Sequence, residues 1–117
     1  MTANLNIKDP RIIKFLTELE ERLIKIFDIR FKKIILFGSY ARGCSDGESD
    51  IDIMVLTDEA DLKKYDDIIL DITVDLSIKY EILPSIILEN FKNFLEYRNY
   101  RPLFRNINEE GIELYAA

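Results

Sequence analysis

Two aspartates separated by one residue, Asp50 and Asp52, are the side chains of this sequence best placed to do chemistry. They alternate with Ile51 and Ile53, and alternate residues of a strand face the same way. Two carboxylates side by side repel each other unless a cation lies between them. Because Mg²⁺ prefers one or two carboxylates together with phosphate oxygens, the pair predicts a magnesium site for a phosphate-bearing substrate.

A Gly-Ser dipeptide, Gly38-Ser39, precedes this pair by ten intervening residues. Gly38 has no Cβ, so a triphosphate could approach the backbone closely there, and Ser39 offers a hydroxyl and an N–H. Arg42 follows three residues after Ser39, within reach of a bound phosphate; the alternative is an arginine that pairs with a surface acid. These residues predict a site for the phosphates of a nucleotide.

The elements that must position these residues are two strands and the turn between them. Residues 33–37 form a short apolar run that stops at Gly38, which is typical of a buried strand ending in a tight turn. Residues 51–56 alternate in a second strand. The sequence therefore predicts a strand, a Gly-Ser turn, a polar excursion and a strand that carries both aspartates.

This ordered set resembles the signature of the DNA polymerase β-type nucleotidyltransferase superfamily, a Gly-Ser followed after a short gap by Asp-x-Asp. The flanking segments 37–43 (FGSYARG) and 49–53 (SDIDI) are similar to the minimal nucleotidyltransferases of bacteria and archaea. Those are small stand-alone domains, often the antitoxin partners of HEPN-family ribonuclease toxins. The resemblance implies an α/β (α+β) nucleotidyltransferase fold, with a small mixed β-sheet and helices mainly on one face.

The resemblance also implies an activity, the Mg²⁺-dependent transfer of AMP from ATP to a protein hydroxyl. A tyrosine of a HEPN-type toxin is the acceptor it implies. Asp50 and Asp52 would be the catalytic and metal-binding residues, and Gly38, Ser39 and Arg42 would bind the nucleotide. The rival interpretation is a catalytically weak or inactive binding module that neutralises its partner by forming a complex.

Size and charge limit the alternatives. We expect residues 1–117 to form a single domain with a loose N-terminus over residues 1–8. The net charge of -6 argues against general nucleic-acid binding and favours a basic protein partner. Histidine is absent and Cys44 is the single cysteine, which excludes histidine catalysis and cysteine-rich zinc sites. With no signal-like or membrane-length apolar run, we expect a cytoplasmic protein.

Other elements follow from local signals along the chain. Asp9-Pro10 begins a long amphipathic helix that ends near Asp28. Thr57-Asp58 is expected to begin the next helix. Residues 90–97 should form another, with Phe91, Phe94 and Leu95 inward, and the aromatic side chains from there to Tyr115, including Tyr97 and Tyr100, are expected in the core. Pro102 begins a short helix that Gly111 stops, followed by a final strand over residues 112–115.

The segment from Leu62 to Tyr80 has two interpretations. As a strand it would alternate through Val74, Leu76 and Ile78, and Asp75 would supply a third carboxylate. As a helix, its apolar residues recur at i, i+3 and i+4, and the strand moves to residues 82–88. Periodicity does not decide between them, and the resemblance favours the helix. On that alignment the third-carboxylate position falls at about Leu83, and the acid is missing.

Overall fold

The computed structural model describes residues 9–38 and 50–116 of the chain. Within these ranges the elements are α1 (Pro10–Phe27), the 3₁₀ turn η1 (Asp28–Arg30), β1 (Phe31–Phe37), β2 (Ile51–Thr57), the 3₁₀ turn η2 (Lys63–Tyr65), α3 (Asp66–Tyr80), β3 (Pro84–Asn90), α4 (Phe91–Tyr97), α5 (Pro102–Glu110) and β4 (Ile112–Ala116). Residues 1–8, for which we expect a loose N-terminus, lie outside the described residues.

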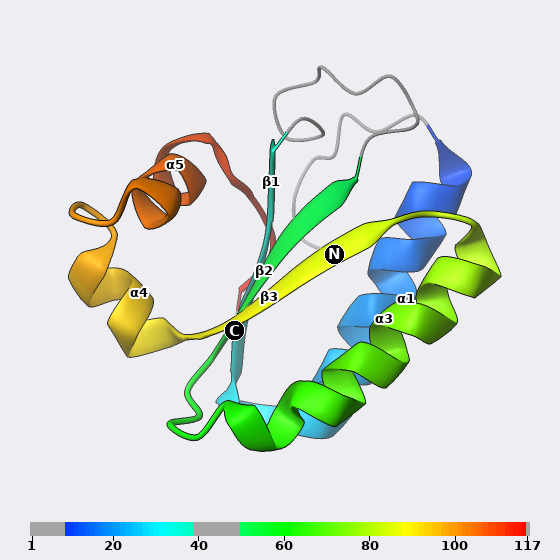
Figure 1. Cartoon of the computed structure of the whole chain (residues 1–117), viewed down its shortest axis with the longest axis horizontal. Coiled ribbons are helices and arrows are strands. Elements are labelled where there is room, and N and C mark those ends of the chain that lie inside the picture. The colour runs from blue at the N-terminus through cyan, green and yellow to red at the C-terminus, as the bar shows by residue number, and fades with distance from the viewer. Residues whose placement is uncertain (1–8, 39–49, 117) are drawn as a thin grey trace.

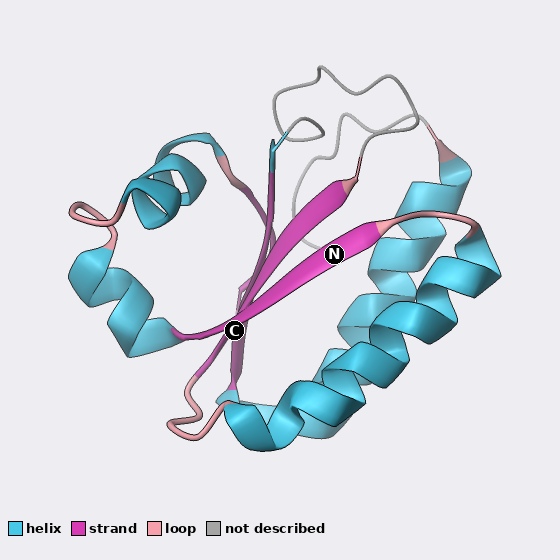
Figure 2. Cartoon of the chain, in the orientation of Figure 1, coloured by secondary structure: helices cyan, strands magenta, loops and turns pink. Residues whose placement is uncertain are grey.

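The four strands of the described chain form one mixed sheet in the order β3-β2-β1-β4. β1 is antiparallel to both of its neighbours, whereas β2 and β3 are parallel and are joined by α3. β4 pairs with β1 from Lys33 to Leu36. Figure 2 shows the strands between two groups of helices. The predicted mixed α/β sheet is confirmed.

The helices cover the sheet unequally (Figure 1). The two long helices, α1 and α3, pack on one face, around Phe15, Leu23, Ile34, Ile53 and Leu76. The two short helices, α4 and α5, pack on the other, around Ile35, Met54, Leu56, Phe94, Phe104 and Ile107. The prediction that helices lie mainly on one face is met by the two long helices, which share one face, while the two short helices cover the other. Because both faces of β2 are covered, its centre is apolar at every position.

Helices α1 and α5 begin at the residues that the local sequence signals predict. The Asp9 side chain caps α1 by accepting a hydrogen bond of 2.9 Å from the Arg11 N–H, and Pro10 occupies the first helical position. Pro102 likewise begins α5, and Gly111 follows its last residue. No helix in the described ranges is long and apolar enough to cross a membrane.

The ambiguous segment is a helix, so the strand interpretation of residues 74–80 is wrong. α3 buries Ile72 and Leu76, four residues apart, against α1. Asp75 lies on this helix and forms an ion pair with Arg22 of α1. The strand begins only at Pro84, after Glu81 ends the helix in a left-handed conformation with φ of 54°. Packing against α1, which periodicity does not describe, decided the outcome.

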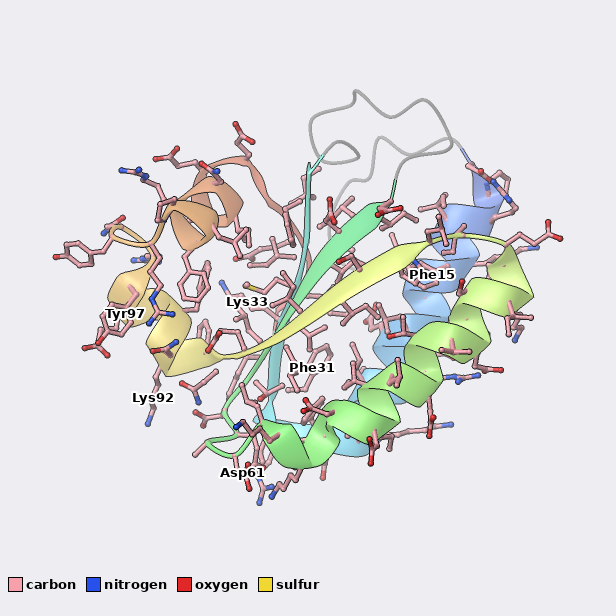
Figure 3. The ribbon with its side chains drawn as sticks, viewed as in Figure 1. Phe15, Phe31, Lys33, Asp61, Lys92 and Tyr97 are labelled. Atoms are coloured by element: carbon pink, nitrogen blue, oxygen red, sulfur yellow. The ribbon has the colours of Figure 1, made fainter. Side chains whose placement is uncertain are left out.

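Two other expectations are wrong. Thr57 does not begin a helix: it is the last residue of β2, fully buried, and its Oγ1 accepts a hydrogen bond from the Glu59 N–H. The hydroxyl therefore closes a turn, a use that competes with helix capping. Leu95, Tyr97 and Tyr100 are exposed by 39%, 36% and 78%, so they lie outside the core, because the short helix α4 buries only Phe94 fully. Tyr97 points outward (Figure 3).

One carboxylate links the two long helices. Glu18 of α1 accepts hydrogen bonds from Lys79 Nζ at 2.6 Å and from the Tyr80 hydroxyl at 2.7 Å, both on α3. It also pairs with Arg22 one turn along its own helix. These partners, Lys79 first, lower the pKa of Glu18 to about 2. Folding therefore stabilises the ionised form of the Glu18 carboxyl group.

We expect Glu18→Gln to destabilise the protein by about 1 kcal/mol at neutral pH, a modest value because water reaches Lys79 and Arg22. The folded-state pKa lies below the unfolded one, so this stability is present above pH 4.5 and is lost as the pH falls toward about 2. Urea denaturation of both proteins across this range would measure it. A difference that stayed constant with pH would contradict the assignment.

Candidate functional site

Gly38 directly follows β1 and has a φ of 74°, a backbone conformation that side chains with a Cβ rarely adopt. Its neighbour Phe37 pairs with Asp52 of β2. A Cβ added at Gly38 would overlap Oδ2 of Asp52 and lie 3.2 Å from its Cγ. The glycine therefore lets the Asp52 carboxylate lie directly against the backbone where β1 ends.

Asp50 immediately precedes β2 and Asp52 is the second residue of that strand. Ile51 and Ile53 are buried against the long helices, and strand alternation places both aspartates on the opposite face. Asp50 is exposed, whereas Asp52 is half-buried. The residues predicted from sequence, Gly38, Asp50 and Asp52, thus come together at one end of the sheet.

Ser39 and Arg42, which the sequence assigns to the nucleotide phosphates, lie outside the described residues. The described donors still allow a test of fit for magnesium. Two carboxylates share one sheet face beside a glycine whose missing Cβ leaves the Asp52 side chain room against the backbone. This oxygen donor set suits Mg²⁺, which completes its coordination with water and substrate phosphates.

The parallel register of β2 and β3 identifies the residue beside Asp50. Ile51 pairs with Pro84, and the Ile51 N–H donates a 3.0 Å hydrogen bond to the Leu83 carbonyl. One residue back, Leu83 therefore stands next to Asp50, with 63% of its surface exposed. Ser85 stands opposite Asp52. Leu83, where the resemblance puts the third carboxylate, and Ser85 thus both stand beside the aspartate pair, and neither is an acid.

Asp75 is not in this group, because it is paired with Arg22 on the outer helices. Within residues 9–38 and 50–116, no group of three acidic, histidine or cysteine side chains could hold a metal ion. The described part of the site is therefore a two-carboxylate site, to which a substrate would have to contribute oxygens.

A cavity of about 300 Å³ that sequence reasoning missed lies between the sheet and the short helices. Its polar lining includes Lys33 of β1, Arg98, Asn108 and Glu113. Lys33 Nζ pairs with Glu113 Oε1 and lies 5.7 Å from the centroid of the Phe91 ring. Figure 3 shows Lys33 on the α4 side of the strands, the face that also carries the aspartates. The sequence signal that could have placed this lysine is its position next to buried Ile34, because neighbouring strand residues face opposite sides of the sheet.

Comparisons with known proteins found a family model, relatives and solved structures that are similar to this chain. A family model described as nucleotidyltransferase domain matches residues 12–110. Two similar proteins of Methanocaldococcus jannaschii are each provisionally named as a protein adenylyltransferase. One is 43% identical over 86 residues, covering 74% of this chain and 80% of the relative. The other is 38% identical over 99 residues, covering 73% of this chain and 99% of the relative.

Solved structures share the fold. A chain in a crystal structure described as a toxin–antitoxin with AMP-PNP has a TM-score of 0.58 at 19% identity, and covers 95% of this chain and 75% of its own length. A chain in the complex of a tri-AMPylated Shewanella oneidensis HEPN toxin with an MNT antitoxin has a TM-score of 0.52 at 15% identity, covering 92% and 73%.

We expect Gly38→Ala to displace the Asp52 carboxylate and to strain the backbone, costing about 1–2 kcal/mol of stability. Binding of Mg²⁺ and ATP, measured by calorimetry on the folded variant, should weaken. Gly111→Ala is the matched control, because its Cβ would overlap Ile107 and Ile35, away from the aspartates. It should lose stability and keep nucleotide affinity. Equal nucleotide affinity in both variants would contradict the role given to Gly38.

Proposed function

This chain belongs to the nucleotidyltransferase domain family, and from that premise we propose that it transfers AMP from ATP to a hydroxyl group of a partner protein, with Mg²⁺. The observation that carries the proposal is the approach of the Asp52 carboxylate to Gly38, beside Asp50, at one end of the sheet. The provisional names of the Methanocaldococcus relatives support the choice of a protein as acceptor.

The residues have distinct roles in this proposal. Asp50 and Asp52 hold Mg²⁺ together with phosphate oxygens, while Gly38 and Ser39 hold the terminal phosphates and Arg42 offsets their charge. When bound, Mg²⁺ supplies charge neutralisation on the triphosphate. The acceptor hydroxyl releases its proton to water, its oxygen forms a bond to the α-phosphorus, the bond from that phosphorus to the bridging oxygen breaks, and pyrophosphate leaves. Positioning and electrostatics are the protein's contribution.

The proposed partner is a HEPN-type toxin, modified on a tyrosine hydroxyl, for which this chain is the antitoxin. The fold neighbours include a complex described as a tri-AMPylated HEPN toxin with its MNT antitoxin. The net charge of -6 suits a basic partner. ATP as the donor fits the cytoplasmic location expected from the sequence.

We expect the Asp50→Asn, Asp52→Asn double variant to lose AMP transfer by about 100-fold or more, because the electrostatic stabilisation of the reacting phosphate is removed. Intact-mass spectrometry of the toxin after incubation with ATP and Mg²⁺ would count the AMP units added. Both substitutions preserve side-chain volume, so a folded variant is expected. Undiminished transfer by the variant would refute the assignment of the aspartates.

A second candidate function rests on Leu83. Three carboxylates complete the site in the superfamily that the sequence resembles, and here the position beside Asp50 carries a leucine. In the second candidate, the chain binds its partner and neutralises it by covering it, with little or no transfer. Toxin that co-elutes with the wild-type chain at unchanged mass would favour this function.

Because Leu83 is largely exposed, a carboxylate can be added there at little cost to folding. We expect Leu83→Asp to tighten Mg²⁺ binding in the presence of ATP by about tenfold or more. Leu83→Asn is the matched control, since it adds a polar group of similar size without charge, and it should leave the affinity unchanged. Calorimetric titration with Mg²⁺ would measure both. An Asp variant no tighter than the Asn variant would place Leu83 outside the metal site.

A further inference from the structure

α3 carries an apolar ridge on the side that faces away from the sheet. Leu70, Val74 and Ile78 are exposed by 60%, 49% and 75%, although all three are large hydrophobic residues. They are spaced four apart, so their side chains lie above one another along one face of the helix. The buried residues of the same helix, Ile72 and Leu76, point toward the core. The ridge is therefore a second apolar face, which no described part of the chain covers.

The ridge continues into a groove of about 370 Å³ beside the edge of the sheet. The groove is lined by Leu62, Asp66, Ile69, Leu70, Thr73, Ile86 and Leu88. Ile86 and Leu88 belong to β3, which is the outermost strand on this side. Ridge and groove meet at Leu70, which belongs to both. Surfaces of this kind on small proteins mark sites of interaction.

One end of the ridge lies at the same end of the sheet as the candidate site. β3 runs parallel to β2 and begins beside it, and α3 ends at Tyr80, just before β3. Ile78, at the far end of the ridge, is thus only five residues from Leu83, which stands next to Asp50. Figure 1 shows this end of α3 at the same end of the molecule as the start of β3. The aspartates lie on the opposite face of the sheet at this end, so a protein bound along the ridge would have to extend around the edge strand β3 to reach them.

The charge beside the ridge identifies the chemistry of the partner. Asp67 and Asp71 lie three residues before Leu70 and Val74, so each acid is one turn from a ridge residue. Neither takes part in an ion pair within the described residues, unlike Asp75, which Arg22 neutralises. Like charges four residues apart repel each other, and a cation supplied from outside would relieve this repulsion. A second copy of the chain would instead bring more acids to the same surface.

We infer that the ridge and groove are the docking surface for the acceptor protein, which presents an apolar ridge or helix bordered by lysine or arginine. This inference rests on the proposed function, because it explains how the nucleotidyltransferase domain could hold its protein substrate. Docking there would supply the positioning that the two-carboxylate site requires.

The test compares two exposed isoleucines. Ile78→Glu disrupts the ridge, and Ile29→Glu, on η1 where the side chain is 82% exposed, is the matched control. The probe is the HEPN-type toxin proposed as acceptor, titrated onto the labelled chain. We expect Ile78→Glu to weaken toxin binding about tenfold or more, with unchanged binding of ATP and an unchanged melting temperature, and Ile29→Glu to bind as wild type does.

A second pair tests the charge. Asp71→Lys and Glu21→Lys change the net charge equally, but only Asp71 borders the ridge, whereas Glu21 lies on α1. Asp71→Lys should weaken toxin binding, most strongly at low salt, and Glu21→Lys should change it little.

The outcomes separate this inference from the proposed function, because binding and transfer are measured apart. Toxin that binds to the wild type, is lost on Ile78→Glu and is never adenylylated would support the docking surface and refute the transfer. Equal binding by Ile78→Glu and Ile29→Glu, or no toxin binding by the wild type, would overturn the docking surface. Sedimentation that showed a wild-type dimer abolished by Ile78→Glu would assign the surface to a second copy and also overturn it.

Discussion

Phe37 of β1 stands opposite Asp52 of β2, and the geometry of the site follows from this antiparallel register. It brings Gly38 against the Asp52 carboxylate, where any larger residue would collide with it. Asp50 then falls on the same sheet face, because strands alternate. A shift by one residue would turn both aspartates into the apolar core beneath the long helices, which would bury two charges. The core that fixes the register therefore also fixes the site.

That core depends on helices on both sides of β2. α1 and α3 hold one face and are linked through Glu18, while α4 and α5 hold the other with fewer residues. The short-helix half of the core reaches β2 only from Met54 onward, which leaves Asp52 outside it. On the side of the long helices, α3 also has an outer apolar surface. The same helix can therefore pack against the sheet and contact a partner. Fold and proposed docking thus use opposite faces of the same element.

The sequence predicted those parts that local chemistry determines. Asp9 and Pro10 specified the start of α1, Pro102 and Gly111 bounded α5, and the apolar run ending at Gly38 specified β1. Residues 74–80 satisfied two periodicities, and only packing against α1 distinguished them. Thr57 failed as a helix start because its hydroxyl closed a turn. The resemblance placed the third-carboxylate position at about Leu83. That Leu83 stands beside Asp50 follows from the pairing of β2 with β3, which no local pattern encodes.

The unequal lengths of the strand pairings around β1 affect how stiff that strand is along its length. β4 supports β1 as far as Leu36, so in the described chain Phe37 has a strand neighbour on the β2 side alone. Phe37, the last residue before Gly38, is therefore held by fewer strand neighbours than the middle of β1. Local opening costs least where hydrogen-bonded neighbours are fewest. The tip of β1, beside the candidate site, can therefore open locally while the remainder of the sheet keeps its shape.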